Sequence, residues 1–529
     1  MVENIKKSEG LSAEKKYNTV VEEANDYIEH FDILETITNV GNDEVFTPRN
    51  TCDMMLDCLP DEVWHTPNYR WLNPATKNGI FEREIALRLD EGLKEIIPEK
   101  EKRRKHILQN MIFSIGQTKF TSNVARRTLY YCSQANRKCD GLKASDGHYI
   151  NGYAIGNGTW FDDEEGNIKT PIAKHDFGKD GKCKYCRISK TSNYMDANQR
   201  EQYAYEFIHI HHLNLSRYLR QKFVKGDNTM KFDIIIGNPP YQLSDGGGTG
   251  DSAKPIYNLF IDQARYLSPK YICMIIPSRW MKGGKGLDDF RKSMIEDTHI
   301  KIIHDFENHA ECFPNNHIDG GVCYFLWDRD HNGKVDYYYK PKDGETTFSK
   351  RFLKTAASDT VIRDYKQLSI LEKIVEKKEN KFSSIVYSRN PYGFNSDFFN
   401  RKESHPEIVI KDTYFENAIK IYGVEGKKGG SKRVCGYIEP KFVVKCKETV
   451  EKYKLLFSKA FTTTATVPPE IIQASPNEIC TETFLLVGGW NTKDEQLSCL
   501  SYMKTKFFRA LLFFNRHSLN ISKESFDLM

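Results

Sequence analysis

The stretch that decides the fold is Lys231-Phe-Asp-Ile-Ile-Ile-Gly-Asn-Pro-Pro-Tyr-Gln242. Residues 234–236 are all isoleucine, an uninterrupted apolar run of the kind found in strands that are buried on both faces. Pro239 and Pro240 cannot continue such a strand, so the chain must turn at its carboxyl end. In open α/β sheets this edge is where ligands bind. The stretch therefore predicts an α/β sheet with a site directly after this strand.

Strand and helix patterns alternate on both sides of this stretch. Apolar runs predict further strands within 71–72, 110–116, 271–280, 301–306 and 321–327. Amphipathic patterns predict helices that begin near Ile80 and that cover 256–267 and 286–295. A tight turn is expected from Asn73 to Gly79, between the first of these strands and the helix after it. The alternation indicates an α/β domain.

The strand and helix pattern divides the chain into three parts. We expect a helical arm (1–44), an α/β domain (45–345) with a cysteine-rich insertion (131–190), and a second domain (346–529). Two interpretations of the second domain stay open: it is complete, or it is truncated at Met529.

Composition excludes several protein classes. The 529 residues carry a net charge of +5 and are 39% hydrophobic and 28% charged, which is typical of a soluble globular protein. No apolar run is long enough for a transmembrane helix, and no secretory signal is evident, so we expect a cytoplasmic protein and no membrane partner. The 13 cysteines are therefore expected to be thiols or metal ligands.

The turn after the central strand offers groups that suit one kind of substrate. Asn238 has an amide oxygen, and the Pro239 carbonyl is freed from sheet pairing because the chain turns there. Both can accept hydrogens from an exocyclic amine, while Tyr241 can stack on a planar base. The alternative interpretation is a purely structural Asn-Pro turn.

The sequence resembles the gamma-class N6-adenine DNA methyltransferases of restriction–modification systems, over roughly residues 45–330. The matching segments, in chain order, are Phe46-Thr47-Pro48, Asn73-Pro74-Ala75-Thr76-Lys77-Asn78-Gly79-Ile80-Phe81, Asn238-Pro239-Pro240-Tyr241, Ile276-Pro277-Ser278-Arg279-Trp280 and Glu311-Cys312-Phe313-Pro314. The resemblance implies a class I, Rossmann-like fold with a mixed seven-stranded sheet, a zinc-knuckle-like insertion and a C-terminal α+β target-recognition domain. It also implies a prokaryotic or phage origin.

The resemblance further implies methyl transfer from S-adenosylmethionine to an adenine that is flipped out of double-stranded DNA. The residues implied in catalysis are Asn238, Pro239, Pro240, Tyr241 and Phe313. The residues implied in cofactor binding are Phe46, Thr47, Pro48, Asn73, Pro74, Ala75, Gly79, Phe81 and Gln117. A restriction endonuclease or helicase subunit is an expected partner, because the chain contains no evident nuclease motif.

The cofactor turn departs from the family pattern. Asn73 stands where the family has an acid, Lys77 and Asn78 replace Gly-Ser, and residues 114–118 lack the acid expected for the ribose. Two interpretations stay open: a divergent but active enzyme, or a weak or inactive DNA-recognition subunit with the same fold. Methylation of RNA or of a protein amide is a further alternative.

The insertion carries a candidate zinc site. Cys183 and Cys186 form a CxxC pair, His175 lies just upstream, and Cys132 is the expected fourth ligand with Cys139 as its substitute. Free thiols in a loop are the alternative.

Two other signals are interpreted as structural. His209, His211 and His212 are assigned to a surface or pocket-rim cluster, with metal binding as the alternative. Asn332-Gly333 predicts a β-hairpin turn rather than a calcium loop.

Overall fold

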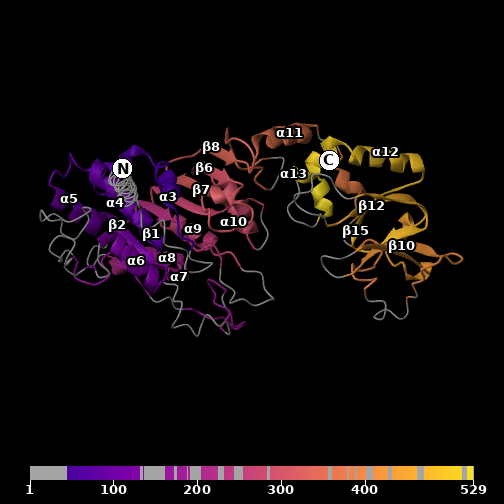
Figure 1. Ribbon diagram of the computed structural model, residues 1–529, viewed down its shortest axis with the longest axis horizontal. Helices are drawn as coiled ribbons and strands as arrows, with labels where there is room; N and C mark the ends of the chain where they lie inside the picture. The colour runs from indigo at the N-terminus through magenta and orange to yellow at the C-terminus, as the bar shows by residue number, and fades with distance from the viewer. Residues whose placement is uncertain are drawn as a thin grey trace, which may run out of the picture. The chain divides into compact units, whose positions relative to one another are not determined.

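The computed structural model describes residues 45–130, 135, 161–171, 175–187, 189–190, 204–223, 231–242, 254–282, 286–355, 360–377, 380–387, 390–400, 408, 410–426, 432–460, 470–514, 521–527 and 529. The predicted helical arm and most of the insertion lie outside these ranges. The chain forms two compact units, one consisting of 1–280 and 284–353 and the other of 281–283 and 354–529. In Figure 1 the first unit runs from indigo to the first orange shades, and the second continues to yellow.

A nine-stranded mixed sheet forms the centre of the first unit. Its spatial order is β3 (Ile168–Lys169), β2 (Ile112–Gly116), β1 (Trp71–Thr76), β4 (Ile234–Gly237), β5 (Tyr271–Pro277), β7 (Val322–Asp328), β6 (Ile300–Phe306), β8 (Val335–Lys340) and β9 (Thr347–Arg351). The five strands from β3 to β5 are parallel, and β7 runs antiparallel to both of its neighbours. The sheet is mixed as expected, but it has two strands more than the seven predicted.

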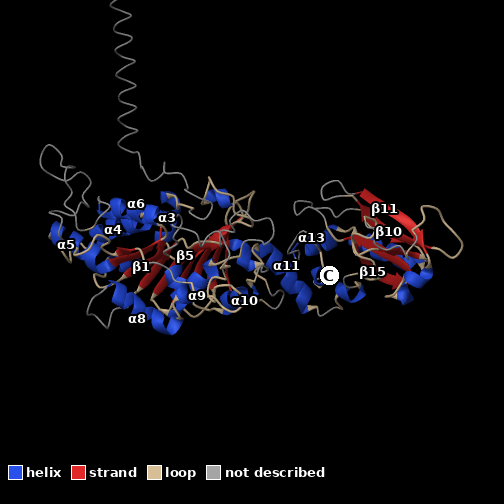
Figure 2. Cartoon of the chain, turned by 90° about the horizontal axis from the view of Figure 1, so that it is seen from below, coloured by secondary structure: helices blue, strands red, loops and turns tan. Residues whose placement is uncertain are grey.

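Helices cover both faces of this sheet (Figure 2). One face carries α3 (Arg49–Leu56), α4 (Ile80–Gly92) and α6 (Lys119–Tyr130), and the other carries α8 (His212–Phe223), α9 (Tyr257–Tyr266) and α10 (Asp288–Glu296). Two shorter helices are α5 (Lys100–His106) and α7 (Tyr205–His209). The three isoleucines of β4 are fully buried. Ile234 and Ile236 belong to one apolar cluster, and Ile235 points to the other face of the sheet. Both faces must therefore be covered by helices.

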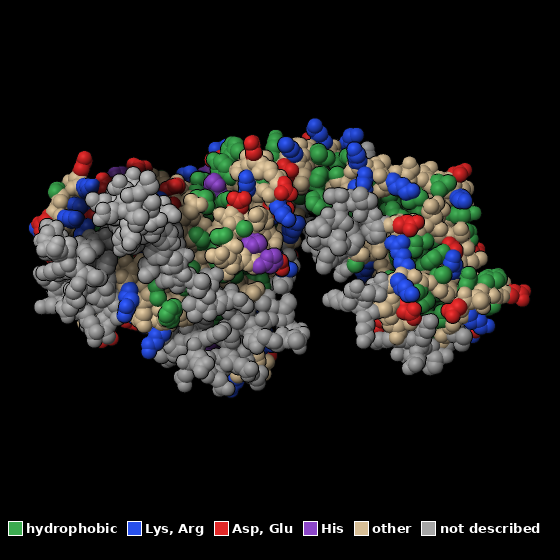
Figure 3. Space-filling view, viewed as in Figure 1, with side chains coloured by type: hydrophobic (Ala, Val, Ile, Leu, Met, Phe, Trp, Pro, Cys, Tyr) green, Lys and Arg blue, Asp and Glu red, His purple; other side chains and the backbone are tan. Residues whose placement is uncertain are grey.

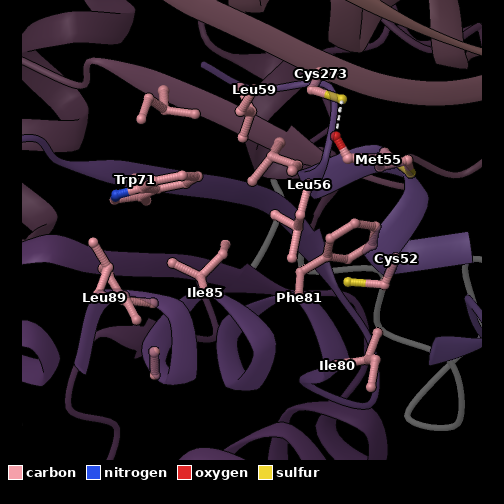
Figure 4. Packing of buried hydrophobic residues seen from close by; sticks show 14 of the residues in the cluster. Cys52, Met55, Leu56, Leu59, Trp71, Ile80, Phe81, Ile85, Leu89 and Cys273 are labelled. Atoms are coloured by element: carbon pink, nitrogen blue, oxygen red, sulfur yellow. Dashed lines mark hydrogen bonds between the residues drawn. The ribbon is translucent and has the colours of Figure 1, made fainter. Parts of the chain in front are cut away.

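Buried side chains on the face that carries α3 and α4 connect β1 with β5 (Figure 4). Trp71 of β1 packs among Leu56, Ile85 and other buried side chains of α3 and α4. On β5, the Cys273 thiol donates to the Met55 carbonyl at 3.5 Å. This packing fixes the helix that follows β1 against the sheet, and so it positions the turn between them.

Two predicted local features are wrong. The strand predicted at Trp71–Leu72 extends to Thr76, and a register shift between Asn73 and Thr76 accommodates Pro74, which cannot donate to a central ladder. The tight turn therefore begins only after Thr76. The hairpin predicted at Asn332-Gly333 does not form either, because β7 is already paired on both sides and β8 pairs with the far edge of β6.

The second unit has two small sheets. One consists of β11 (Lys432–Ile438), β10 (Ile419–Glu425) and β14 (Glu478–Cys480), and the other of β13 (Ile472–Ala474), β12 (Tyr453–Ser458) and β15 (Phe484–Trp490). Its longer helices are α11 (Tyr365–Glu376), α12 (Lys493–Met503) and α13 (Lys506–Phe514). In the part of the chain that the structure describes, every helix is too short or too polar to cross a lipid bilayer.

Candidate active site

Two turns meet at the carboxyl edge of the first unit's sheet. The turn after β1 contains Lys77 to Gly79, and the turn after β4 begins at Asn238. Because β1 and β4 are parallel neighbours, their carboxyl ends lie side by side. Gly237 keeps them close: a Cβ atom there would lie 2.5 Å from the Asn73 side-chain oxygen. The two turns lie 159 or more residues apart in the sequence, because several helices, further strands and the insertion come between them.

Asn238 is oriented by two acceptors. Its amide nitrogen donates to the Val45 carbonyl at 3.2 Å and to the Thr47 hydroxyl oxygen at 3.1 Å. A backbone carbonyl can only accept, so the amide must turn its nitrogen toward Val45 and its oxygen away. That oxygen is buried and has no hydrogen-bond partner among the described residues. A buried acceptor without a partner is costly, which is the mark of a group kept for a ligand.

Two hollows adjoin this turn. The larger cavity has a volume of about 410 Å³. Its lining residues are Val45, Lys77, Pro239, Tyr241, Gln242, Pro255, Tyr257, Pro277, Arg279, Asn316, His317, Ile318 and Asp319. The smaller hollow is lined by Asn238, Thr47, Asn73 and the turn residues 75–82. Lys77 lines both hollows, and the sequence neighbours Asn238 and Pro239 line one each.

Tyr241 forms one wall of the larger cavity. Its ring contacts Tyr257 and Phe313 edge-on, at centroid distances of 6.4 and 6.5 Å. Burial raises the pKa of the Tyr241 phenol well above its ordinary value, so the ring is neutral at physiological pH. Phe313 is 1% exposed and belongs to the apolar core behind Tyr241. Its predicted contact with a base stays a prediction.

The turn after β1 is organised by a buried carboxylate that the sequence interpretation missed. Glu82, in the first turn of α4, accepts from Asn73 Nδ2 at 2.9 Å and from the Ser114 hydroxyl at 2.6 Å. Burial raises the pKa of Glu82, and the Ser114 and Asn73 hydrogen bonds partly oppose that shift. Glu82 thus places a carboxyl group directly beside the Asn73 side chain. The sequence concealed its role, because Glu82 is followed by Arg83 and Glu84 in what looks like a charged, exposed run.

Glycine and lysine shape the rest of the turn. Gly79 has φ of +82° and begins α4, and a Cβ there would lie 2.9 Å from the Ala125 backbone. The Lys77 ammonium donates to the Val45 carbonyl at 2.9 Å. Lys77 and Asn238 therefore share an acceptor.

The other predicted cofactor residues lie around this turn. Thr47, Ala75, Gly79 and Phe81 line the smaller hollow with Asn73. Phe46 is buried, Pro48 caps α3, and Pro74 lies within β1. Gln117 is fully buried at the end of β2, where its backbone N–H donates to the Thr76 carbonyl at 2.9 Å. Its predicted contact with a ribose stays a prediction.

The structure brings three of the four predicted metal ligands together. His175, Cys183 and Cys186 cluster with His209, and their ligand atoms all lie within 4.8 Å of one another. The assignment of His209 to a surface or pocket rim is wrong, since its side chain is 6% exposed within this cluster. Cys132 and Cys139 lie outside the described residues.

Comparisons with known proteins bear on the family of this chain. The family model described as "Eco57I restriction-modification methylase" matches residues 110–313, a range that includes Asn238–Tyr241 and Phe313. An adenine-specific methylase of Mycoplasma pneumoniae is 44% identical over 369 residues, which cover 68% of this chain and 84% of the relative.

Solved structures also resemble the chain, at low identity. The type IIL restriction–modification enzyme MmeI in complex with DNA has a TM-score of 0.42 and 11% identity, over 90% of this chain and 63% of that one. The ATP-dependent type ISP enzyme LlaBIII bound to DNA has a TM-score of 0.38 and 11% identity, over 96% and 39%. The chain thus spans less than two thirds of either protein.

The extent and identity of the match to the Mycoplasma methylase, together with the family model over the central strand and its turn, assign the family. This chain belongs to the adenine-specific DNA methyltransferases of restriction–modification systems.

Proposed function

We propose that the chain transfers a methyl group from S-adenosylmethionine to the N6 amine of an adenine flipped out of duplex DNA. The observation that carries this proposal is the Asn238 side-chain oxygen, which is buried, held in one orientation and without a partner among the described residues. An exocyclic amine in the cavity would supply the missing donor. The paired amine of a stacked adenine cannot reach this atom, so the base must leave the helix.

Asn238 and Pro239 would act on the amine together. Their two carbonyl oxygens accept its two hydrogens, which leaves the nitrogen lone pair directed away from both acceptors. Tyr241 supplies a neutral ring for stacking on the base. The 410 Å³ cavity lined by Pro239 and Tyr241 accommodates a purine, and Arg279 adds a positive charge to its lining for the DNA backbone. These groups work by positioning the amine.

We assign the cofactor to the smaller hollow, which has a volume of only about 10 Å³, so the turn after β1 must move to admit it. It is lined by the turn after β1 and reaches Asn238, so a group bound there lies next to the amine. The N-terminus of the 13-residue helix α4 favours the negative end of an amino acid, and the Lys77 ammonium lies beside it. Glu82 and Asn73 supply the polar pair that replaces the family's acid. When bound, S-adenosylmethionine supplies an electrophilic methyl group.

We further propose that the second unit, residues 354–529, selects the DNA sequence. Its two sheets have their own apolar cores, so it can present a rigid surface independently of the methyl-transfer site. A separate nuclease or helicase subunit would complete a restriction–modification system.

The test uses purified full-length protein, radiolabelled S-adenosylmethionine and genomic DNA from a strain that lacks adenine methylation. We expect incorporation of label, recovery of N6-methyladenine after digestion, and loss of about 100-fold or more in rate for Asn238→Ala. Cofactor binding, measured by calorimetry, should survive in that variant. Binding without transfer by the unaltered chain would favour the inactive DNA-recognition subunit instead, and absence of binding would reject the cofactor assignment.

A further inference from the structure

A cluster of four side chains lies apart from the methyl-transfer site. His175, Cys183, Cys186 and His209 place one nitrogen or sulfur atom each within 4.8 Å of all the others. The Cys186 sulfur lies 3.5 Å from His175 Nδ1. The two histidine rings approach with centroids 4.7 Å apart, edge to face. None of these residues contributes to the cavity or the cofactor turn, so the proposed reaction does not account for them.

The distances suit tetrahedral coordination. Zn–S bonds of about 2.3 Å and Zn–N bonds of about 2.0–2.1 Å place neighbouring sulfur and nitrogen ligands about 3.5 Å apart. The Cys186–His175 separation has this length. We propose that the four side chains bind a structural zinc ion, with His209 as the fourth ligand in place of Cys132. Four protein ligands close the coordination sphere, so this zinc would have no position for a substrate.

The backbone around the cysteines has the form of a metal-binding turn. The Arg187 N–H donates to the Cys183 carbonyl at 3.0 Å, and Arg187 has φ of +65°, so the chain reverses directly after Cys186. Phe177 and Cys183 form an antiparallel bridge, which brings His175 alongside the turn. Local hydrogen bonds thus direct three ligands from one short segment toward one point.

Apart from a bound metal, few interactions can stabilise the segment around Cys183 and Cys186. Cys183 and Cys186 are 0% and 2% exposed, yet polar and charged residues make up most of the segment around them. A turn of this composition cannot bury enough apolar surface to order itself, whereas a bound metal can supply the missing free energy.

The fourth ligand comes from a well-anchored helix. His209 is the last residue of α7, and Gln263 of α9 donates its side-chain amide to the carbonyls of Phe207 and Ile210, at 3.0 and 2.6 Å. Phe207 also stacks on Phe260 of α9, at a centroid distance of 5.8 Å. The zinc would therefore fasten the end of the cysteine-rich insertion to α7, which packs on α9, and α9 in turn packs on β5.

The proposal predicts one zinc ion per chain in protein purified without chelator, measured by elemental analysis. His209→Ala should weaken zinc binding by about 100-fold or more, measured by competition with a chromophoric chelator. The control His211→Ala removes an exposed neighbouring histidine, and Cys435→Ser removes an exposed cysteine; both should keep the metal. Zinc loss in His211→Ala but not in His209→Ala would overturn the assignment.

X-ray absorption distinguishes a ligand from a residue that merely supports the fold. The unaltered protein should show two sulfur and two nitrogen ligands. His209→Cys should keep zinc and change this set to three sulfurs and one nitrogen, because it replaces one ligand with another. Three sulfurs in the unaltered protein, together with zinc loss in Cys132→Ser, would reject His209 in favour of Cys132. Folded protein without zinc, and with no zinc uptake, would reject the site altogether.

Discussion

The Asn238 side chain is held in one orientation by two hydrogen bonds. Residues 238–241 predict a turn whose groups can accept hydrogens from an exocyclic amine, and binding of that amine stays a prediction. The anchors of the Asn238 side chain are not visible, because Val45 and Thr47 lie 193 and 191 residues away in the sequence. Glu82 was missed for a related reason: a carboxylate in a charged run of a helix shows its role only when Asn73 and Ser114 are seen to donate to it.

Tyr241 separates the role of a ring from that of a hydroxyl. The hydroxyl is buried and has no partner in the described part of the chain, whereas the ring lines the cavity. We expect Tyr241→Phe to keep methyl transfer within a few fold, and to raise the free energy of unfolding by about 1 kcal/mol. Tyr241→Ala should lose activity by about tenfold or more, since stacking on a base is worth about 1–3 kcal/mol.

Initial rates and thermal melts of both variants check this prediction. An equal loss of activity in Tyr241→Phe and Tyr241→Ala would show that the hydroxyl, and not the ring, carries the function.

Glu82 gives the stability a pH dependence of known sign. Because its folded-state pKa is raised, the unfolded chain loses the proton first as pH rises above 4.5, and the free energy of unfolding falls until the folded carboxyl ionises. Glu82→Gln removes this loss and keeps an acceptor for Asn73 and Ser114. We expect the variant to gain stability over the unaltered protein as the pH rises above 4.5, and the gain to level off once the folded carboxyl ionises. Thermal melts of both proteins across this range measure the gain.

The exposed Glu95→Gln serves as the control and should show no such trend. If the difference in stability between Glu82→Gln and the unaltered protein shrank as the pH rises, the Glu82 carboxylate would stabilise the apo fold.

At the scale of elements, the contact between the two turns is the feature most open to test. Gly237→Ala would place a methyl group 2.5 Å from the Asn73 oxygen, so one turn must move. We expect a loss of more than about 2 kcal/mol in stability and a loss of cofactor binding. Gly286→Ala is the matched control: it also has a positive φ (+79°) but open space around it, and should lose only about 1 kcal/mol.

Equal losses in the two glycine variants would mean that backbone strain alone, and not the approach of the turns, is responsible.

Lys454 supports an element of the second unit. At the start of β12 its ammonium donates to the carbonyls of Thr449, Val450 and Lys452, each at 2.8 Å, and its side chain is fully buried. Lys454→Met would leave three carbonyls without this donor. We expect a loss of about 2–3 kcal/mol, against less than about 0.5 kcal/mol for the exposed Lys445→Met. Denaturant titration measures both, and equal values would contradict the assigned role.

Strands with strong apolar runs were predictable from the sequence, and the half-buried strand β8 was not. β4, β5 and β7 are buried along their whole length, so composition alone identifies them. β8 alternates buried and half-buried residues, and its partner β6 cannot be inferred from the Asn-Gly turn before it. Pairing across a sheet is a long-range property, which local turn signals do not determine.

For the whole molecule, charge gives little guidance about function. On the face shown in Figure 3, Lys and Arg side chains are interspersed with Asp and Glu, in keeping with a net charge of +5. The metal cluster was predictable only in part: the CxxC pair and His175 lie within twelve residues, whereas His209 comes from a separate helix. Local spacing identifies a knuckle, but the fourth ligand depends on tertiary packing.

Methylation of adenine in host DNA tests the proposed reaction in living cells. Host DNA is sequenced for N6-methyladenine after expression in a strain that lacks adenine methylation, with Asn238→Ala at matched expression as the control. We expect N6-methyladenine at a recurrent DNA sequence in cells that express the unaltered chain, and none in cells that express the variant. Folded, cofactor-binding protein that leaves no mark, or a mark that persists in Asn238→Ala, would contradict it.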